Sequence, residues 1–312
     1  MPTPHRHIEG IDTETLVRDL TRTAVKQRLA AVVTCFPLAA EAAADNHERV
    51  HQLRVSTRRA VAALILFKRF CPRRRTARLL RDLKQIRRAA GRARDLDVFT
   101  TRLATSSEET HQELLQSLTA ERQTAQKEIV DLFNRFAKSN RLDSRIGAVS
   151  KRLHPRGTKA KRLGRKTVAE WAPRCLRKAA KRLLEAVPTS LDQAEKLHPL
   201  RVEGKQCRYT LELLAAGLPD ESYDDISLRL KEFQDRLGAI NDHDSAINRL
   251  STHALADRAA IDRLIVQERA SMLQAIENFQ TWFAANFLLR LQEMVSTGND
   301  GPATAQPLNS AS

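Results

Sequence analysis

The chain has 312 residues, of which 53 are Lys or Arg and 37 are Asp or Glu, so its formal net charge is +16. This surplus of positive charge indicates polyanionic partners and carries no information about the fold. No run is long and apolar enough for a membrane span or a signal peptide, and four scattered cysteines without a CxxC pair fit reduced thiols in the cytoplasm.

Strong helix formers dominate the chain and strand signals are weak, so nearly every segment is predicted to be helical. In chain order, the predicted helices cover residues 12–34, 46–70, 74–105, 107–139, 162–187, 192–216, 222–252 and 254–294. Predicted breaks fall near Pro37, Pro72, Pro155–Gly157, Pro188 and Pro219. Residues 141–165 mix glycine and proline with basic residues and are predicted to be a connection.

The sequence contains an internal repeat. Residues 51–100 align with residues 198–247 without a gap, and twelve of the fifty pairs are identical, whereas composition alone gives about three. The repeat predicts an internal duplication. We therefore expect an N-terminal end at 1–11, a first half at 12–155, a second half at 156–295 and a disordered tail at 296–312.

Helical geometry separates apolar from polar residues in both copies, since successive residues turn by about 100°. The predicted core stripes are Leu53, Ala60, Leu64 and Phe67 in the first copy, and Leu200, Cys207, Leu211 and Leu214 in the second. The opposite faces carry His51, Arg54 and Arg58, and His198, Arg201 and Lys205. Nitrogen donors at such steps suit a row of phosphates. The alternative to an anion-binding row is an ordinary charged face exposed to solvent. This alternative is less favoured because the same pattern recurs at the aligned positions of both copies.

Positive charge is concentrated in the first half and the middle of the chain. Residues 1–140 carry 26 Lys/Arg against 16 Asp/Glu, residues 141–182 carry 15 against 2, and residues 183–312 carry 12 against 19. The second helix of the first copy has a basic face formed by Arg81, Lys84, Arg88 and Arg92, of which the second copy keeps only Lys231. We therefore expect the first half to bind anions more strongly.

A basic run between residues 159 and 182 has Glu170 as its single counter-charge. An anionic ligand would relieve its self-repulsion, and the candidates on its helix are Arg174, Arg177, Lys178 and Lys181. A generic solubility surface or non-specific nucleic-acid binding is the alternative interpretation of this run.

Two aspartates end the repeat, Asp95 and Asp97, with copies Asp242 and Asp244. Asp97 and Asp244 continue the apolar stripes, so each needs a cationic or hydrogen-bonding partner. We expect all four to orient Arg or His side chains. A D-x-D pair can also hold Mg²⁺ or Ca²⁺, but orientation is favoured and no metal site is assigned. No serine-nucleophile motif or zinc-ligand spacing is found, so no catalytic residue is assigned.

The repeated H-x-L-R-V helix and the segment that ends in D-x-D resemble the CHAD family, the conserved histidine α-helical domain. The matching segments are residues 50–59 with 91–98 and residues 197–209 with 237–242, within a resemblance that covers about residues 10–294. The resemblance implies an all-α fold of two four-helix bundles related by a pseudo-twofold axis. It also implies long helices around a basic central groove or pore that binds inorganic polyphosphate, and an association with polyphosphate granules.

The E-x-E-x-K element of the triphosphatase-type domain found in many family members is absent, which indicates a stand-alone binding module without a cofactor. The predicted polyphosphate ligands are His51, Arg54, Arg58, Arg59, Arg81, Lys84, Arg88, Arg92, Arg174, Arg177, Lys178, Lys181, His198, Arg201, Lys205, Arg208 and Lys231. One rival is a general nucleic-acid binder, although an aromatic content of 4% leaves few rings to stack on bases. The other is a phosphoanhydride hydrolase with His51 or His198 as the acid or base.

Overall fold

The computed structural model describes residues 8–41, 46–104, 111–252 and 258–296. Within these ranges the regular structure is helical, apart from an isolated bridge between Leu16 and Thr167. The all-α class predicted from the sequence is therefore confirmed. Residues 1–7 and 297–312, which contain most of the predicted N-terminal end and tail, lie outside the described residues.

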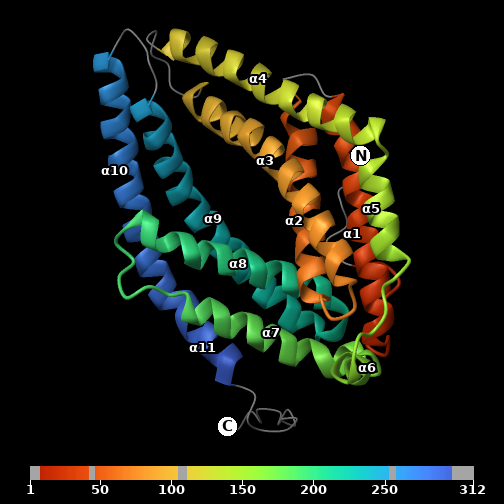
Figure 1. Ribbon diagram of the computed structural model, residues 1–312. Helices are drawn as coiled ribbons and strands as arrows, with labels where there is room; N and C mark the ends of the chain where they lie inside the picture. Colours follow the sequence, from red (N-terminus) through yellow and green to blue (C-terminus); the bar gives the residue numbers. More distant parts are fainter. Residues whose placement is uncertain (1–7, 42–45, 105–110, 253–257, 297–312) are drawn as a thin grey trace, which may run out of the picture.

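The long helices pack mainly against the long helices that precede and follow them in the chain (Figure 1). The first are α1 (Val17–Ala40), α2 (His47–Leu66), α3 (Arg73–Ala104), α4 (His111–Lys138), α5 (Arg141–Ser150) and α6 (Thr158–Gly164). The others are α7 (Val168–Glu185), α8 (Ala194–Leu214), α9 (Asp220–Thr252), α10 (Arg258–Trp282) and α11 (Leu288–Ser296). A 3-10 turn (Ala215–Gly217) follows α8, and a π-helical turn (Phe283–Phe287) joins α10 to α11.

The predicted break near Pro37 and the predicted connection at 141–165 are wrong, because burial outweighs local propensity. Pro37 lies inside α1, where the neighbouring Phe36 and Ala39 are buried, so the helix continues for another turn despite the missing N–H. The predicted connection at 141–165 contains α5 and α6, and Leu142 and Val149 of α5 are buried. The actual break is the turn before α6, where Gly157 has a φ of 79° that favours glycine.

The first predicted helix begins five residues later than expected, at Val17. Thr15 explains the delay, because its backbone N–H donates to Asp12 Oδ1 at 2.7 Å and its hydroxyl donates to the same oxygen at 2.6 Å. This side-chain turn competes with helix formation. The backbone N–H of Val17 then donates to the carbonyl of Lys166, which ties the start of α1 to the segment before α7.

Both predicted core stripes are confirmed. All eight of their residues, from Leu53 to Phe67 and from Leu200 to Leu214, are at most 1% exposed. The cations predicted on the opposite faces are half-buried or exposed. The repeated helices α2 and α8 therefore turn equivalent apolar faces to the interior.

The two halves share part of their interior. A first core fills the space among α1 to α5, and it also contains Leu250, Ile261 and Leu264 from the adjoining ends of α9 and α10. A second core lies among α7 to α11 and centres on Phe233, whose ring stacks on Phe287 with centroids 4.6 Å apart. The end of the α9–α10 hairpin therefore packs into the core of the first half.

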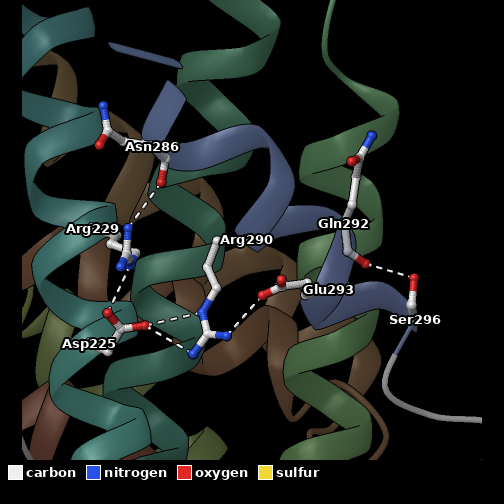
Figure 2. Close-up of polar contacts among 7 residues, drawn as sticks. All are labelled: Asp225, Arg229, Asn286, Arg290, Gln292, Glu293 and Ser296. Atoms are coloured by element: carbon white, nitrogen blue, oxygen red, sulfur yellow. Dashed lines mark hydrogen bonds and ion pairs between the residues drawn. The ribbon is translucent and has the colours of Figure 1, made fainter. Parts of the chain in front are cut away.

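Polar contacts attach the last helix to α9 (Figure 2). Arg229 donates to Asp225 at 2.8 Å and to the backbone carbonyl of Asn286, in the π-helical turn, at 3.0 Å. Arg290 donates to Asp225 at 3.2 Å and to Glu293 at 2.9 Å. Asp225 therefore holds two arginines at the junction of α9 and α11.

All four cysteines are free thiols, as the sequence predicts, and Cys35, Cys71 and Cys207 are buried. Burial raises the pKa of the Cys71 thiol to about 11. Across the described ranges, no helix combines the length and hydropathy that crossing a membrane requires.

Candidate anion-binding site

Helix α8 packs against α2 (Figure 1). Basic side chains from both halves come close to one another at this contact. Arg58 of α2 interacts electrostatically with Arg54 on its own helix and with Arg201 and Lys205 of α8. Arg87 and Arg94 of α3 join them through their interactions with Arg54 or His51. We call this set the central cation cluster: His51, Arg54, Arg58, Arg87, Arg94, Arg201 and Lys205.

Close packing of like charges alters the protonation of the cluster. Burial is the main reason that the pKa of Lys205 falls to about 6, and the nearby Arg201, Arg58 and Arg54 contribute to the same decrease. Burial also lowers the pKa of His51, with Arg94 as the largest charge contribution. Arg54, with a pKa lowered mainly by burial to about 10, keeps its charge at neutral pH. The site therefore concentrates positive charge that an anion would stabilise.

Two carboxylates partly offset the positive charge of Arg54 and Arg201. Asp95 Oδ1 lies 3.3 Å from Arg54 Nη2, and the Asp95 side chain is 58% exposed. Asp242, at the aligned position of the second copy, is the largest charge that offsets the effect of burial on Arg201. Arg201 Nε is nevertheless buried and has no hydrogen-bond partner within the described part of the chain. A buried donor of this kind favours an anionic acceptor.

A glycine on α3 makes room for Arg54. A Cβ atom on Gly91 would lie 2.6 Å from Arg54 Nη1, whereas the aligned Gly238 has open space around it. The absence of a side chain at Gly91 thus lets the guanidinium lie against the α3 backbone. The contact explains the glycine in the first copy of the repeat and leaves the second unexplained.

A cleft of about 590 Å³ opens from the cluster between α3 and α9. Arg54, Asp95, Arg201 and Asp242 line it, so cations from both halves face the same space. We call it the central cleft.

Ion pairs between the halves lie at the end of the central cleft away from the cluster. Arg102 of α3 lies 2.6 Å from Glu268 of α10, and Arg249 of α9 lies 2.6 Å from Glu121 of α4. The ring of His243 is also part of this contact, with Nδ1 2.8 Å from Arg102 and 2.6 Å from Glu268. The two guanidiniums that line this end are thus neutralised by carboxylates.

The basic face predicted on α3 is divided between two surfaces. Lys84 is exposed and lies about 20° from Gly91 around the helix axis, on the side of the cluster. Arg88 and Arg92 instead line a hollow of about 890 Å³ beside α4, where Arg92 pairs with Glu128 at 2.5 Å. Arg81 is exposed, as is Lys231 of the second copy, which lies 3.9 Å from Asp235.

Two other predicted ligands belong to a buried network. Arg59 Nε lies 2.8 Å from Glu212 Oε2, and Arg208 Nε lies 3.7 Å from the other oxygen of the same carboxylate. Burial lowers the pKa of Arg28 to about 10. The negative charge of Glu212 opposes this decrease by stabilising the charged guanidinium. This network joins α1, α2 and α8, and its carboxylate already occupies the place of an anion.

The remaining predicted ligands lie outside the cluster. His198 is exposed beside a hollow of about 370 Å³ that Arg201 and Asp244 also line. On α7, Arg174, Lys178 and Lys181 are exposed and Arg177 is half-buried, and none of the four is among the charges that act on the cluster. A role for these residues in binding stays a prediction.

The four repeated aspartates have different partners. Asp97 is fully buried, with Oδ1 2.5 Å from Arg122 Nε and 2.7 Å from His47 Nδ1, so it orients an Arg and a His outside the cluster. Asp244 is half-buried and accepts a hydrogen bond from Asn248 at 3.3 Å. No group of side chains in the described ranges has the arrangement of a metal site.

Arg87 and Arg94 are the cluster residues that the sequence analysis missed. Both lack a basic copy, because Gln234 and Asn241 stand at the aligned positions. Their spacing around Gly91, at four residues before and three after, places all three on one face of α3. That spacing is the signal that identifies them.

Comparison with known proteins places this geometry in a family. A family model described as the CHAD domain matches residues 23–251. The chain belongs to the CHAD family. The CHAD domain from the plant Ricinus communis has a similar crystal structure, with a TM-score of 0.65, 20% identity and coverage of 93% of this chain and 95% of that one. PptA from Streptomyces chartreusis matches with a TM-score of 0.65, 14% identity and coverage of 86% and 100%. No curated protein matches the chain.

Proposed function

We propose that this CHAD protein binds inorganic polyphosphate in the central cleft, against the central cation cluster. The observation that carries the proposal is the convergence of Arg54 and Arg58 with Arg201 and Lys205 across the two halves. A linear chain of phosphates offers a negative charge at every unit and therefore suits a row of cations better than a single anion does.

The electrostatics support a ligand with many charges. Seven basic groups face three carboxylates, Glu48, Asp95 and Asp242, so a bound anion would meet a net positive site. Binding would release counterions from the polymer and would weaken steeply with salt. The family resemblance implies the same ligand, and it extends the proposal to cytoplasmic polyphosphate granules.

A general affinity for nucleic acid is the second candidate, which the net charge of +16 favours. The cluster contains no Phe, Tyr or Trp on which a base would stack, and its neighbour Tyr209 is buried beside Arg208. We therefore propose that nucleic acid binds only non-specifically, and that polyphosphate is held without turnover.

The test is a titration of the full chain with polyphosphate, with equal-charge duplex DNA and with sulfate, at low and physiological salt. Arg54→Glu with Arg201→Glu should abolish polyphosphate binding while helicity is kept. Lys127→Glu with Lys138→Glu, on the exposed face of α4, is the charge-matched control and should retain binding. Unchanged binding by the first pair would exclude the cluster as the site.

Released phosphate is measured in the same samples with Mg²⁺. Turnover that disappears in His51→Ala would make the protein a hydrolase and would overturn the binding-only proposal. Equal affinity for DNA and polyphosphate would reduce the function to general polyanion binding.

A further inference from the structure

A second basic surface lies outside the central cleft, at the corner of the molecule where α2 turns into α3. Residues 68–81 and 151–166 contain fifteen Lys and Arg and no Asp or Glu. Two backbone hydrogen bonds hold the segments together, from His154 to Phe70 at 3.1 Å and from Arg156 to Arg69 at 3.2 Å. We call these two segments the basic corner.

The positive charge of the basic corner is not neutralised within the protein. Among the described residues, none of its fifteen cations forms an ion pair, and fourteen are exposed. The acids that approach it have other partners, since Asp19 pairs with Arg18 and Arg22 at 3.4 Å, and the buried Asp82 pairs with Arg141 and Arg145. Such a concentration of like charge indicates an external polyanion.

The chemistry of the corner fits a phosphate backbone. Its large apolar side chains, including Phe70, Leu79 and Leu153, are buried or half-buried, so the surface exposes no Phe, Tyr or Trp ring for a base and no large apolar group for a lipid bilayer. The imidazole of His154 is the exposed ring of the corner. Recognition at this surface therefore depends on charge.

A row of cations on α3 connects the corner to the central cation cluster. Arg75, Arg78, Arg81, Lys84 and Arg87 follow one another at intervals of three residues, which forms a continuous ridge on a helix. The ridge rises by about 18 Å along the helix axis, with a cation about every 4.5 Å. Arg87 belongs to the cluster and Arg78 to the corner, so the ridge leads from one to the other.

The second half has no such ridge. The aligned positions on α9 are Ser222, Asp225, Leu228, Lys231 and Gln234. Asp225, at the position of Arg78, is the carboxylate that holds Arg229 and Arg290 at the junction of α9 and α11 (Figure 2). The path therefore runs in one direction only, toward the first half.

We propose that a long polyphosphate chain leaves the central cleft along this ridge and is held a second time at the basic corner. This inference rests on the proposed function and adds that the affinity for polyphosphate increases with the length of the polyphosphate chain. A short chain occupies the cluster alone, whereas a long one gains the corner as a linked second site with a high effective concentration.

The test compares tripolyphosphate, which is too short to reach the corner, with long-chain polyphosphate. The corner variant carries Arg74→Gln, Arg78→Gln, Lys161→Gln and Arg162→Gln, all exposed positions. The control variant removes the same charge elsewhere, with Lys138→Gln, Lys196→Gln, Arg263→Gln and Arg269→Gln, also exposed. Thermal unfolding verifies that both variants fold as the unmodified chain does.

We expect the corner variant to bind tripolyphosphate normally and long chains about tenfold more weakly. Its slope of log affinity against log salt should fall by about 3 for long chains, as loss of four phosphate contacts predicts for a single-stranded polyanion. Equal weakening of both ligands, or the same loss in the control variant, would overturn the inference.

Two further outcomes separate this inference from the proposed function. If the unmodified chain binds neither ligand, the proposed function fails and the extended path fails with it. If the corner variant loses affinity for duplex DNA but keeps its affinity for long polyphosphate, the corner binds nucleic acid, and only the inference is overturned.

Discussion

Arg59 Nε lies 2.8 Å from Glu212 Oε2, and this buried ion pair joins α2 of the first half to α8 of the second. Arg208 and Arg28 depend on the same carboxylate. One acid thus balances three guanidiniums directly behind the face on which the central cation cluster is built. Two of the three helices that carry the cluster, α2 and α8, are thus held together by a buried charge.

Glu212→Gln should destabilise the protein strongly, because it leaves buried arginines without a counter-charge. We expect the free energy of unfolding to fall by about 3–5 kcal/mol, measured by urea denaturation. Glu232→Gln removes a carboxylate from a more exposed pair with Arg236 and should cost less than about 1 kcal/mol. Equal losses in the two variants would contradict a structural role for the buried network.

Asp97→Asn and Asp244→Asn compare the two copies of one repeated aspartate. Asp97 is fully buried between Arg122 and His47, so its variant should lose about 3 kcal/mol of stability. Asp244 is half-buried with an amide partner, so its variant should change stability by about 0.5 kcal/mol at most. Thermal melting of the two variants side by side checks the difference, and similar shifts would refute it.

Gly91→Ala should weaken polyphosphate binding without destabilising the fold. The new Cβ would displace the Arg54 guanidinium, which is the flexible end of a side chain and can move. Gly238→Ala is the matched control, since nothing lies within 4 Å of its Cβ, and it should retain binding. Both helices should gain up to about 1 kcal/mol from the alanine. Titration with tripolyphosphate distinguishes the variants, and identical affinities would argue against the Arg54 position.

Polyphosphate binding should take up protons near neutral pH. The pKa of Lys205 is about 6, so its amine is mostly neutral at pH 7, and a bound anion would favour the charged form. Affinity should therefore rise as the pH falls from about 8 to 6. Calorimetric titration in buffers of different ionisation enthalpy measures the uptake, and Lys205→Met should reduce it. Uptake that persists undiminished in that variant would exclude Lys205 as its source.

Lys205 should also make stability depend on pH. Between its folded pKa of about 6 and its ordinary value of 10.5, the unfolded chain binds the extra proton. Stability therefore rises with pH across this window, and Lys205→Met should flatten that rise and raise stability at pH 7. Urea denaturation at several pH values checks the sign, and a parallel pH dependence in the variant would contradict it.

The sequence predicts the faces of the helices better than their partners. The period of 100° per residue is enough to place Leu53 in the core and Arg54 outside it. No local pattern indicates that Arg59 meets Glu212, because the two residues are 153 positions apart. The contact between Asp97 and Arg122 is equally invisible in a local pattern, because Arg122 reaches Asp97 from another helix.

The sequence predicts only some of the residues in the central cation cluster, because the place of the others depends on how the helices pack. Arg54 and Arg201 are repeated, so the alignment of the two copies is enough to identify them. Arg87 and Arg94 belong to the first copy alone, and their place beside His51 and Arg54 depends on how α3 packs against α2. Burial also decides the end of α1, where Phe36 outweighs Pro37.

The packing of Leu250, Ile261 and Leu264 into the core of the first half sets an order of events during synthesis. These residues leave the ribosome more than a hundred positions after α4 is complete. At about 5–20 residues per second, the wait is roughly 6–25 s. During that time the first core lacks these three apolar side chains, so the nascent chain should be a chaperone client until the α9–α10 hairpin emerges and completes the core.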